Sequence, residues 1–106
     1  MFSGEIDLRN NTKITIDNLL NVVDLFKREN NLKIESIFDL DNGFNGLINF
    51  RNISTRNIVK ININGKQTSM IIRCYDDFEQ FSQYYESLKN IIDENFVIEQ
   101  TPHLIE

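Results

Sequence analysis

A strand that runs almost directly into the longest helix, between residues 70 and 96, constrains the fold more than any other part of the chain. From Met70 to Cys74 the apolar residues alternate in the manner of a half-buried strand. Asp76 stands three residues before Glu79, which is the spacing of a capping box, so a helix is expected from Asp76. After it, apolar residues recur at steps of three and four and predict one buried helix face, made of Phe78, Phe81, Tyr85, Leu88 and Ile92 and widened by Tyr84 and Ile91.

The other elements precede this stretch and follow the same two periodicities. We expect a first strand over 2–8, a helix over 15–31, and strands near 34–40, 47–53 and 58–63. The pair Asn30-Asn31 suits a left-handed stop for the first helix. Residues 96–99 are expected to form a last short strand or a docked extension, and residues from about 100 to 106 a loose tail. The prediction is a single α+β domain over 1–106. Its antiparallel sheet has four or five strands with two helices packed on one face, in the order β-α-β-β-β-β-α.

Asn64-Gly65 is the clearest local signal, because this dipeptide suits the positive φ angles of a type I′ hairpin turn. A two-residue turn there predicts a hairpin of strands 58–63 and 66–73, in which Ile63 pairs with Lys66, and Val59 with Met70. The same register leaves a polar, solvent-facing side of the sheet, made of Lys60, Asn62, Gln67, Ser69 and Arg73.

The predicted core lies between the other side of the sheet and the helices. Its members are the apolar residues that fall on the inward faces: Ile6, Leu8, Leu19, Val22, Val23, Phe26, Phe38, Ile61, Met70, Ile72, Phe81, Tyr85 and Leu88. The lone Cys74 is expected to be a buried thiol without a disulfide. Together with the absence of a signal-peptide pattern and of an apolar run long enough to span a membrane, this suggests a cytoplasmic protein.

Charge is distributed unevenly along the chain. Residues 1–41 carry five bases and eight acids, residues 42–75 five bases and no acid, and residues 76–106 one base and eight acids, which gives −3, +5 and −7. One explanation is that a basic sheet and an acidic helix neutralise each other through surface salt bridges, each of which contributes little to stability. An acidic face presented to a basic partner would explain it as well.

Most chemical sites fail a test of residue type and spacing. Counted from Asp39 as an EF-hand loop, Phe44 stands where the glycine belongs and Phe50 where the bidentate glutamate belongs. One cysteine and one histidine, Cys74 and His103, cannot supply a zinc site, and an apolar strand does not activate a thiol. The four glycines form no phosphate loop, so no cofactor or metal is expected.

Nucleic acid is not expected as a partner either. The open side of the sheet carries Lys60 and Arg73, with Arg51 a further candidate. However, RNA-binding sheets add aromatic residues on which bases stack, and the sequence places none there. The net charge of −5 argues in the same direction.

By elimination, a binding module is favoured over an enzyme. The first hypothesis is a non-catalytic inhibitor of a protein partner, specifically an immunity protein that neutralises a bacterial toxin such as a basic nuclease. The second is a phage- or plasmid-encoded inhibitor of a host system, and the third is a small enzyme or ligand-binding domain that uses the open side of the sheet. For the inhibitor, the candidate binding residues are Glu79, Glu86, Asp93 and Glu94 on the second helix, and an exposed sheet edge is the alternative surface. The sequence does not predict the oligomeric state.

Overall fold

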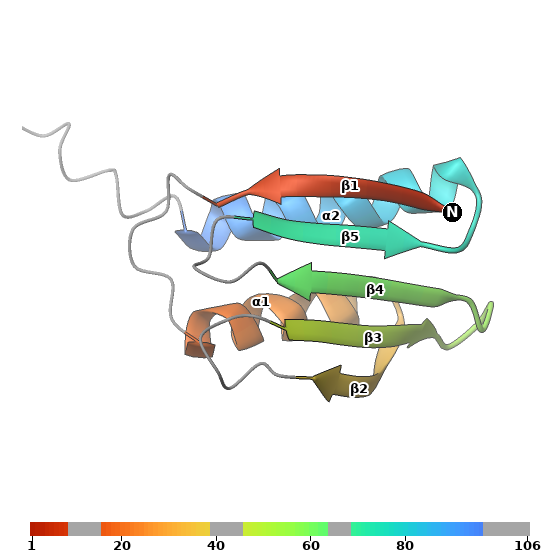
Figure 1. The fold of residues 1–106 in the computed structure, drawn as a ribbon, viewed down its shortest axis with the longest axis horizontal. Helices are drawn as coiled ribbons and strands as arrows, with labels where there is room; N and C mark the ends of the chain where they lie inside the picture. The colour runs from red at the N-terminus through yellow and green to blue at the C-terminus, as the bar shows by residue number, and fades with distance from the viewer. Residues whose placement is uncertain (9–15, 39–45, 64–68, 97–106) are drawn as a thin grey trace, which may run out of the picture.

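In the computed structural model, residues 1–8, 16–38, 46–63 and 69–96 are described, and they form five strands and two helices (Figure 1). In chain order the elements are β1 (Phe2–Asp7), α1 (Ile16–Glu29), β2 (Leu32–Phe38), β3 (Gly46–Asn52), β4 (Ile58–Ile63), β5 (Ser69–Cys74) and α2 (Phe78–Phe96). The predicted α+β class and the order β-α-β-β-β-β-α are confirmed. Phe96 closes α2, so it does not begin a strand, and the predicted tail lies outside the described residues.

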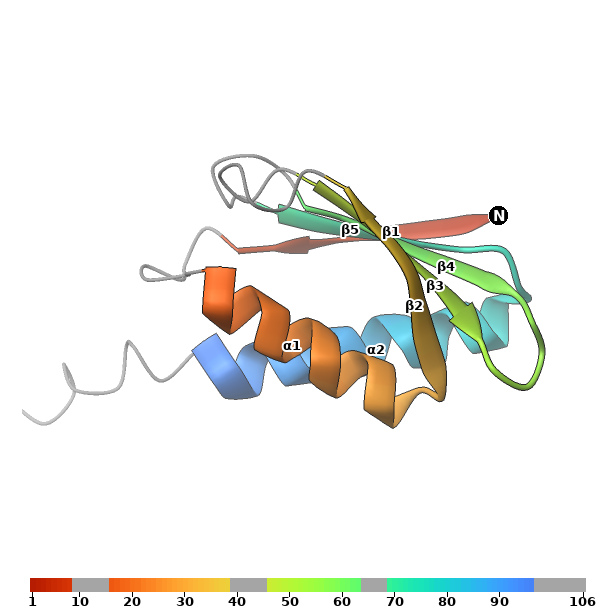
Figure 2. The same cartoon turned by 90° about the horizontal axis from the view of Figure 1, so that it is seen from below.

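The first and last strands of the chain are neighbours in the sheet. The order is β1-β5-β4-β3-β2, and every neighbouring pair is antiparallel. The segment that contains α1 therefore carries the chain from one edge of the sheet to the other. Both helices lie on the same side of the sheet, and among the described residues no helix or strand covers the opposite side (Figure 2). We call that uncovered side the open face.

The core fills the space between the sheet and the two helices. Along the strands every second side chain points into this layer, which is why alternating apolar residues are buried there. Of the predicted core residues, all except Phe38 and Tyr85 are buried, and Tyr85 is partly buried. Cys74 is buried, as expected, and so are Tyr84, Ile91 and Ile92 on the apolar face predicted for the second helix. The other buried apolar residues that the core list did not name are Leu32, Ile48, Phe50, Val59 and Ile63.

Phe38 was predicted in the core and is instead exposed by 51%. The reason is an irregularity in β2, between Ile34 and Ser36. Ile34 lies opposite the buried Phe50, whereas Ser36 lies opposite Asn49, which points the other way. One extra residue in a strand exchanges the faces of everything after it. Phe38 therefore lies on the open face, although the sequence alternation predicts the core.

The hairpin of β4 and β5 exists, but its predicted register is wrong by four residues. Ile63 pairs with Met70, and Val59 with Cys74. Because a shift by an even number of residues keeps each side chain on its face, the predicted inward and outward sets are unchanged. The turn at Asn64-Gly65, together with Gln67, lies outside the described residues.

The helix ends confirm one local prediction and correct another. Asn31 follows α1 with a φ of 58°, as expected for a left-handed stop. At the start of α2 the capping residue is Asp77, whose carboxylate accepts the Gln80 backbone N–H at 2.8 Å. Asp76, the predicted cap, instead accepts a hydrogen bond from the side-chain amide of Asn57 at 2.8 Å. It thereby ties the start of α2 to the β3–β4 connection.

Candidate functional site

The four carboxylates predicted to bind a partner are all exposed on α2. Glu79, Glu86 and Asp93 are separated by steps of seven residues, which is about two helical turns, so they follow one line with roughly 10 Å between neighbours. Glu94 lies beside the end of this line. We call these four residues the acidic stripe. The helix displays them along its length and does not gather them into one cluster.

None of the stripe carboxylates forms an ion pair within the described part of the chain, where the paired acids are Asp24 and Glu35. The last turn of α2 holds no base, although Asp93 and Glu94 stand there. Carboxylates at this end face the negative end of the helix dipole, which costs about 0.3–1 kcal/mol in exposed positions. The two acids at the end of α2 therefore do not help the helix to form.

An exposed group of aromatic rings adjoins the start of the acidic stripe. The Phe2 ring lies 5.5 Å from the Phe78 ring and 5.9 Å from the Phe81 ring, measured between centroids. Phe78 is exposed by 62% and Phe2 by 36%, whereas Phe81 is buried. We call these three residues the aromatic cluster. It forms where the start of α2 passes the N-terminal end of β1 (Figure 1).

The aromatic cluster was missed from the sequence, which placed Phe78 and Phe81 together on one buried helix face. Their periodicity is helical, but Phe78 is the first residue of α2, and its side chain is mostly open to solvent. The contact with Phe2 depends on the pairing of β1 with β5, which joins residues far apart in the chain. No local pattern carries that information.

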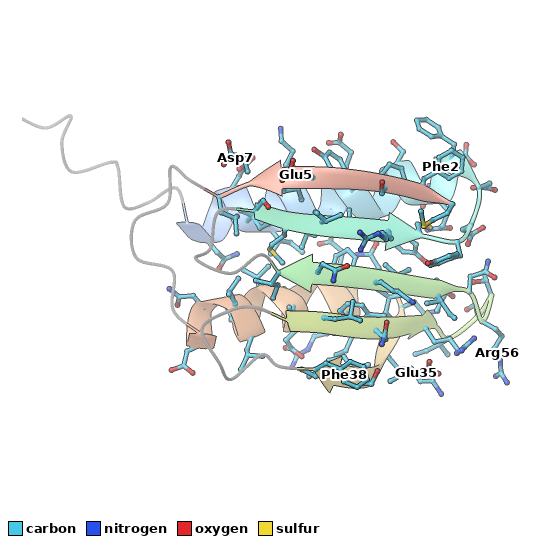
Figure 3. All side chains as sticks on the ribbon, viewed as in Figure 1. Phe2, Glu5, Asp7, Glu35, Phe38 and Arg56 are labelled. Atoms are coloured by element: carbon cyan, nitrogen blue, oxygen red, sulfur yellow. The ribbon has the colours of Figure 1, made fainter. Side chains whose placement is uncertain are left out.

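The open face has the polar centre that the sequence predicts, and it also carries aromatic residues that the sequence did not place. Lys60, Asn62, Ser69 and Arg73 all project from it. Tyr75 continues the alternation of β5 and lies under the Lys60 ammonium, with the ring centroid 5.7 Å from Nζ. Phe38 stands at the opposite edge, on β2 (Figure 3). The signal for Tyr75 was present, because it stands two residues after Arg73.

The two edges of the sheet differ in how they are protected. At β1, the Tyr85 hydroxyl donates to the Glu5 carbonyl at 3.0 Å and so occupies a backbone acceptor of the edge. At β2, the bulge near Glu35 interrupts the ladder, and three apolar side chains are exposed beside it: Ile34, Ile37 and Phe38. A bulge is a usual device against strand addition, so neither edge is a regular template for a partner strand.

The described residues provide no equipment for catalysis by cysteine or metal. The Cys74 thiol is fully buried, and burial raises its pKa, which is the opposite of an activated nucleophile. Among the described residues no group of three or more His, Cys, Asp and Glu side chains could hold a metal ion. His103 and the Asp39–Gly43 turn lie outside the described ranges.

Comparison with known proteins gives no relative: no family model, no curated protein and no solved structure matches this chain. Within the described ranges, neither helix is long and apolar enough to cross a membrane. The features that bear on function are therefore the acidic stripe, the aromatic cluster and the open face.

Proposed function

We propose that this protein is a non-catalytic inhibitor that binds a basic protein partner through the acidic stripe, specifically an immunity protein that neutralises a bacterial toxin such as a nuclease. The observation that carries the proposal is that Asp93 and Glu94 hold negative charge where the helix dipole disfavours it, and that neither forms an ion pair among the described residues, where Lys89 is the one base of α2. Charge that does not serve folding is best explained by a partner. The inhibitor would act in the cytoplasm, where a toxin of this kind has its target.

The aromatic cluster supports this proposal because it can supply binding energy, of which a row of exposed carboxylates provides little. Exposed carboxylates steer a basic partner and speed association, but each adds little affinity in water. Binding energy in protein interfaces is concentrated in a few large side chains, often aromatic, surrounded by polar residues. Phe78 and Phe2 are such side chains, and Glu79 follows Phe78 directly in the helix.

Cell protection tests the proposal. The gene next to this one in its source genome is expressed in bacteria with and without this chain, and survival is scored. We expect the neighbouring product to be toxic and the chain to protect. An inhibitor of a host system, carried by a phage or plasmid, would instead lack a toxic neighbour and would lower the activity of a host enzyme.

The surface is tested by reversing Glu79, Glu86 and Asp93 to Lys together. Because these side chains are exposed and form no ion pair among the described residues, the variant should fold, but it should lose protection and bind the toxin at least about a hundredfold more weakly at low salt. The Asp17→Lys variant, with one exposed charge reversed on α1, is the control and should protect fully. Unchanged affinity in the folded triple variant would remove the stripe from the interface, and catalytic activity of the purified protein would refute the inhibitor itself.

A further inference from the structure

We propose that the open face is a second binding surface, centred on Lys60 and Arg73, and that its ligand is an extended acidic segment of a protein. Lys60 on β4 lies directly opposite Arg73 on β5, and both project from the open face. Side chains in such a pair start about 5 Å apart, and like charges in this arrangement destabilise a sheet. The proximity of the two like charges does not stabilise the fold, whereas an anionic ligand would bind between them.

Neither cation is neutralised within the described residues. The Lys60 ammonium lies over the Tyr75 ring, and the Arg73 guanidinium donates to the Asn62 side-chain carbonyl. Both contacts orient a cation and leave its charge in place. Arg51, on the same face, shows the contrast: its guanidinium donates to the Glu35 carboxylate at 2.7 Å, which raises the pKa of Arg51 and lowers that of Glu35.

Two buried polar atoms on the open face favour a polypeptide as the ligand. Asn49 lies opposite Lys60 and donates its amide to the Ser36 hydroxyl at 2.8 Å, but its side-chain carbonyl has no hydrogen-bond partner among the described residues. Ser69, exposed by only 4%, has a hydroxyl that is likewise unpartnered there. A buried acceptor requires a donor. A peptide backbone brings N–H donors as well as acidic side chains, whereas a phosphate group brings acceptors alone.

The surroundings of the cation pair argue against a nucleic-acid strand. Glu5 and Asp7 line the face along β1, and Glu35 stands toward the other edge (Figure 3). A phosphate backbone that crosses the sheet from the cation pair toward β1 would meet the carboxylates of that strand directly. Toward β2 the face also carries Lys33 and Arg51, and there Arg51 is already paired with Glu35. Between the two edges of the sheet lie three half-buried aliphatic side chains, Leu47, Ile58 and Ile71, which give the mixture of apolar and polar groups found in protein interfaces. The open face lies across the sheet from α2, so this inference does not rest on the acidic stripe (Figure 2).

Nuclear magnetic resonance titration of the isotope-labelled full chain tests the proposal. The probe is a blocked heptapeptide that alternates glutamate with leucine, valine and phenylalanine. The same peptide with glutamine in place of glutamate is the charge control. We expect the glutamate peptide to shift the backbone amide signals of β3, β4 and β5, with an affinity that falls as salt rises. Lys60→Gln and Arg73→Gln should each weaken binding about tenfold, because each removes one charge-assisted contact.

Lys89→Gln, on the other side of the molecule, is the matched control and should bind the peptide as the unaltered protein does. Lys60→Gln relieves a like-charge contact and loses the contact with the Tyr75 ring, and these two effects are of similar size, so its melting temperature should be close to that of the unaltered protein, which separates lost binding from lost folding. The proposal is overturned if the glutamate peptide causes no shifts in β3–β5, if the glutamine peptide binds equally well, or if Lys60→Gln and Arg73→Gln bind unchanged. It is also overturned if a short oligothymidylate binds the face and the peptide does not.

Discussion

At the scale of single residues, the buried hydrogen bond between Asn52 and Tyr84 connects the two layers of the molecule. The Asn52 amide, at the end of β3, donates to the Tyr84 hydroxyl of α2 at 2.8 Å. Its side-chain carbonyl accepts the backbone N–H groups of Ser54 and Thr55 at 2.9 and 3.0 Å. One side chain thus fixes the start of the β3–β4 connection and satisfies the one polar atom of a large buried ring.

Replacing Tyr84 with Phe should destabilise the protein by about 1–3 kcal/mol, because the Asn52 amide is left buried without its acceptor. Tyr85→Phe is the matched control. That variant removes the hydrogen bond from the Tyr85 hydroxyl to the Glu5 carbonyl. Because this carbonyl lies at the exposed edge of the sheet, water can replace the lost donor. We expect the Tyr85 variant to lose less than the Tyr84 variant in urea denaturation followed by circular dichroism. Equal losses would show that the buried Asn52–Tyr84 hydrogen bond stabilises the protein no more than the exposed Tyr85–Glu5 hydrogen bond does.

Gly4 is required by a close approach between β1 and α2. A β-carbon at this position would lie 2.8 Å from two ring carbons of Tyr85 and 3.1 Å from the Phe81 ring. The Tyr85 ring has little freedom to withdraw, because its hydroxyl is bonded to the neighbouring Glu5 carbonyl. We therefore expect Gly4→Ala to destabilise by about 1–3 kcal/mol, as overpacking does.

A second substitution tests whether the added methyl group meets the Tyr85 ring. In a Tyr85→Leu background the Gly4→Ala substitution should cost markedly less, since the smaller side chain leaves room for the methyl group. Melting temperatures of the four proteins in this cycle are the measurement. Additive effects of the two substitutions would show that the methyl group does not meet Tyr85.

At the scale of elements, the sequence predicts which segments form strands and helices better than it predicts how they are aligned. Periodicity located every described element, because alternation and helical spacing are properties of neighbouring residues. The β4–β5 register was wrong because Asn64-Gly65 suggested a two-residue turn, whereas the observed pairing matches Ile63 with Met70. Phe38 was misplaced because a bulge leaves no mark in an alternating pattern.

The acidic end of α2 allows a prediction that separates folding from binding. Glu94→Lys replaces a carboxylate in the last turn with a cation, which the helix dipole favours, so the variant should be more stable by about 0.3–1 kcal/mol. The same variant should bind the proposed basic partner more weakly. Thermal denaturation at low salt is the measurement, with Glu94→Gln expected at an intermediate value. A less stable Glu94→Lys variant would mean that this carboxylate has a structural partner.

At the scale of the whole molecule, the charge blocks of the sequence become two surfaces on opposite sides of the sheet. The acidic block places the four carboxylates of the acidic stripe on α2, and the basic block places Lys60 and Arg73 on the open face. The two do not neutralise each other within the described residues, where the ion pairs involve α1, β2 and β3. Exposure of the four stripe residues was predictable from helical spacing. The aromatic cluster was not, because it needs Phe2 and Phe78 to meet across the pairing of β1 with β5.

The core also predicts how stability depends on pH. Cys74 and Tyr84 are both fully buried, and burial raises the pKa of the thiol and of the phenol above their ordinary values. In the unfolded chain these groups ionise near about pH 8.5 and 10. A group with a raised folded-state pKa contributes its full stability below the unfolded pKa and loses it as pH rises toward the folded value. The free energy of unfolding should therefore be level near neutral pH and fall above about pH 8.5, by at most about 1.4 kcal/mol per pH unit for each group.

Urea denaturation in the presence of a reductant, from pH 7 to about pH 10, measures this dependence. Cys74→Ala isolates the thiol: the cavity lowers stability at every pH, but the thiol no longer titrates, so the decline that begins near pH 8.5 should become shallower. Tyr84→Phe should likewise flatten the steeper decline near pH 10. Every other ionisable group is common to the proteins compared and contributes alike to each curve. The difference in slope between each variant and the unaltered protein is therefore the decisive quantity, and parallel curves would mean that neither group keeps its proton in the core.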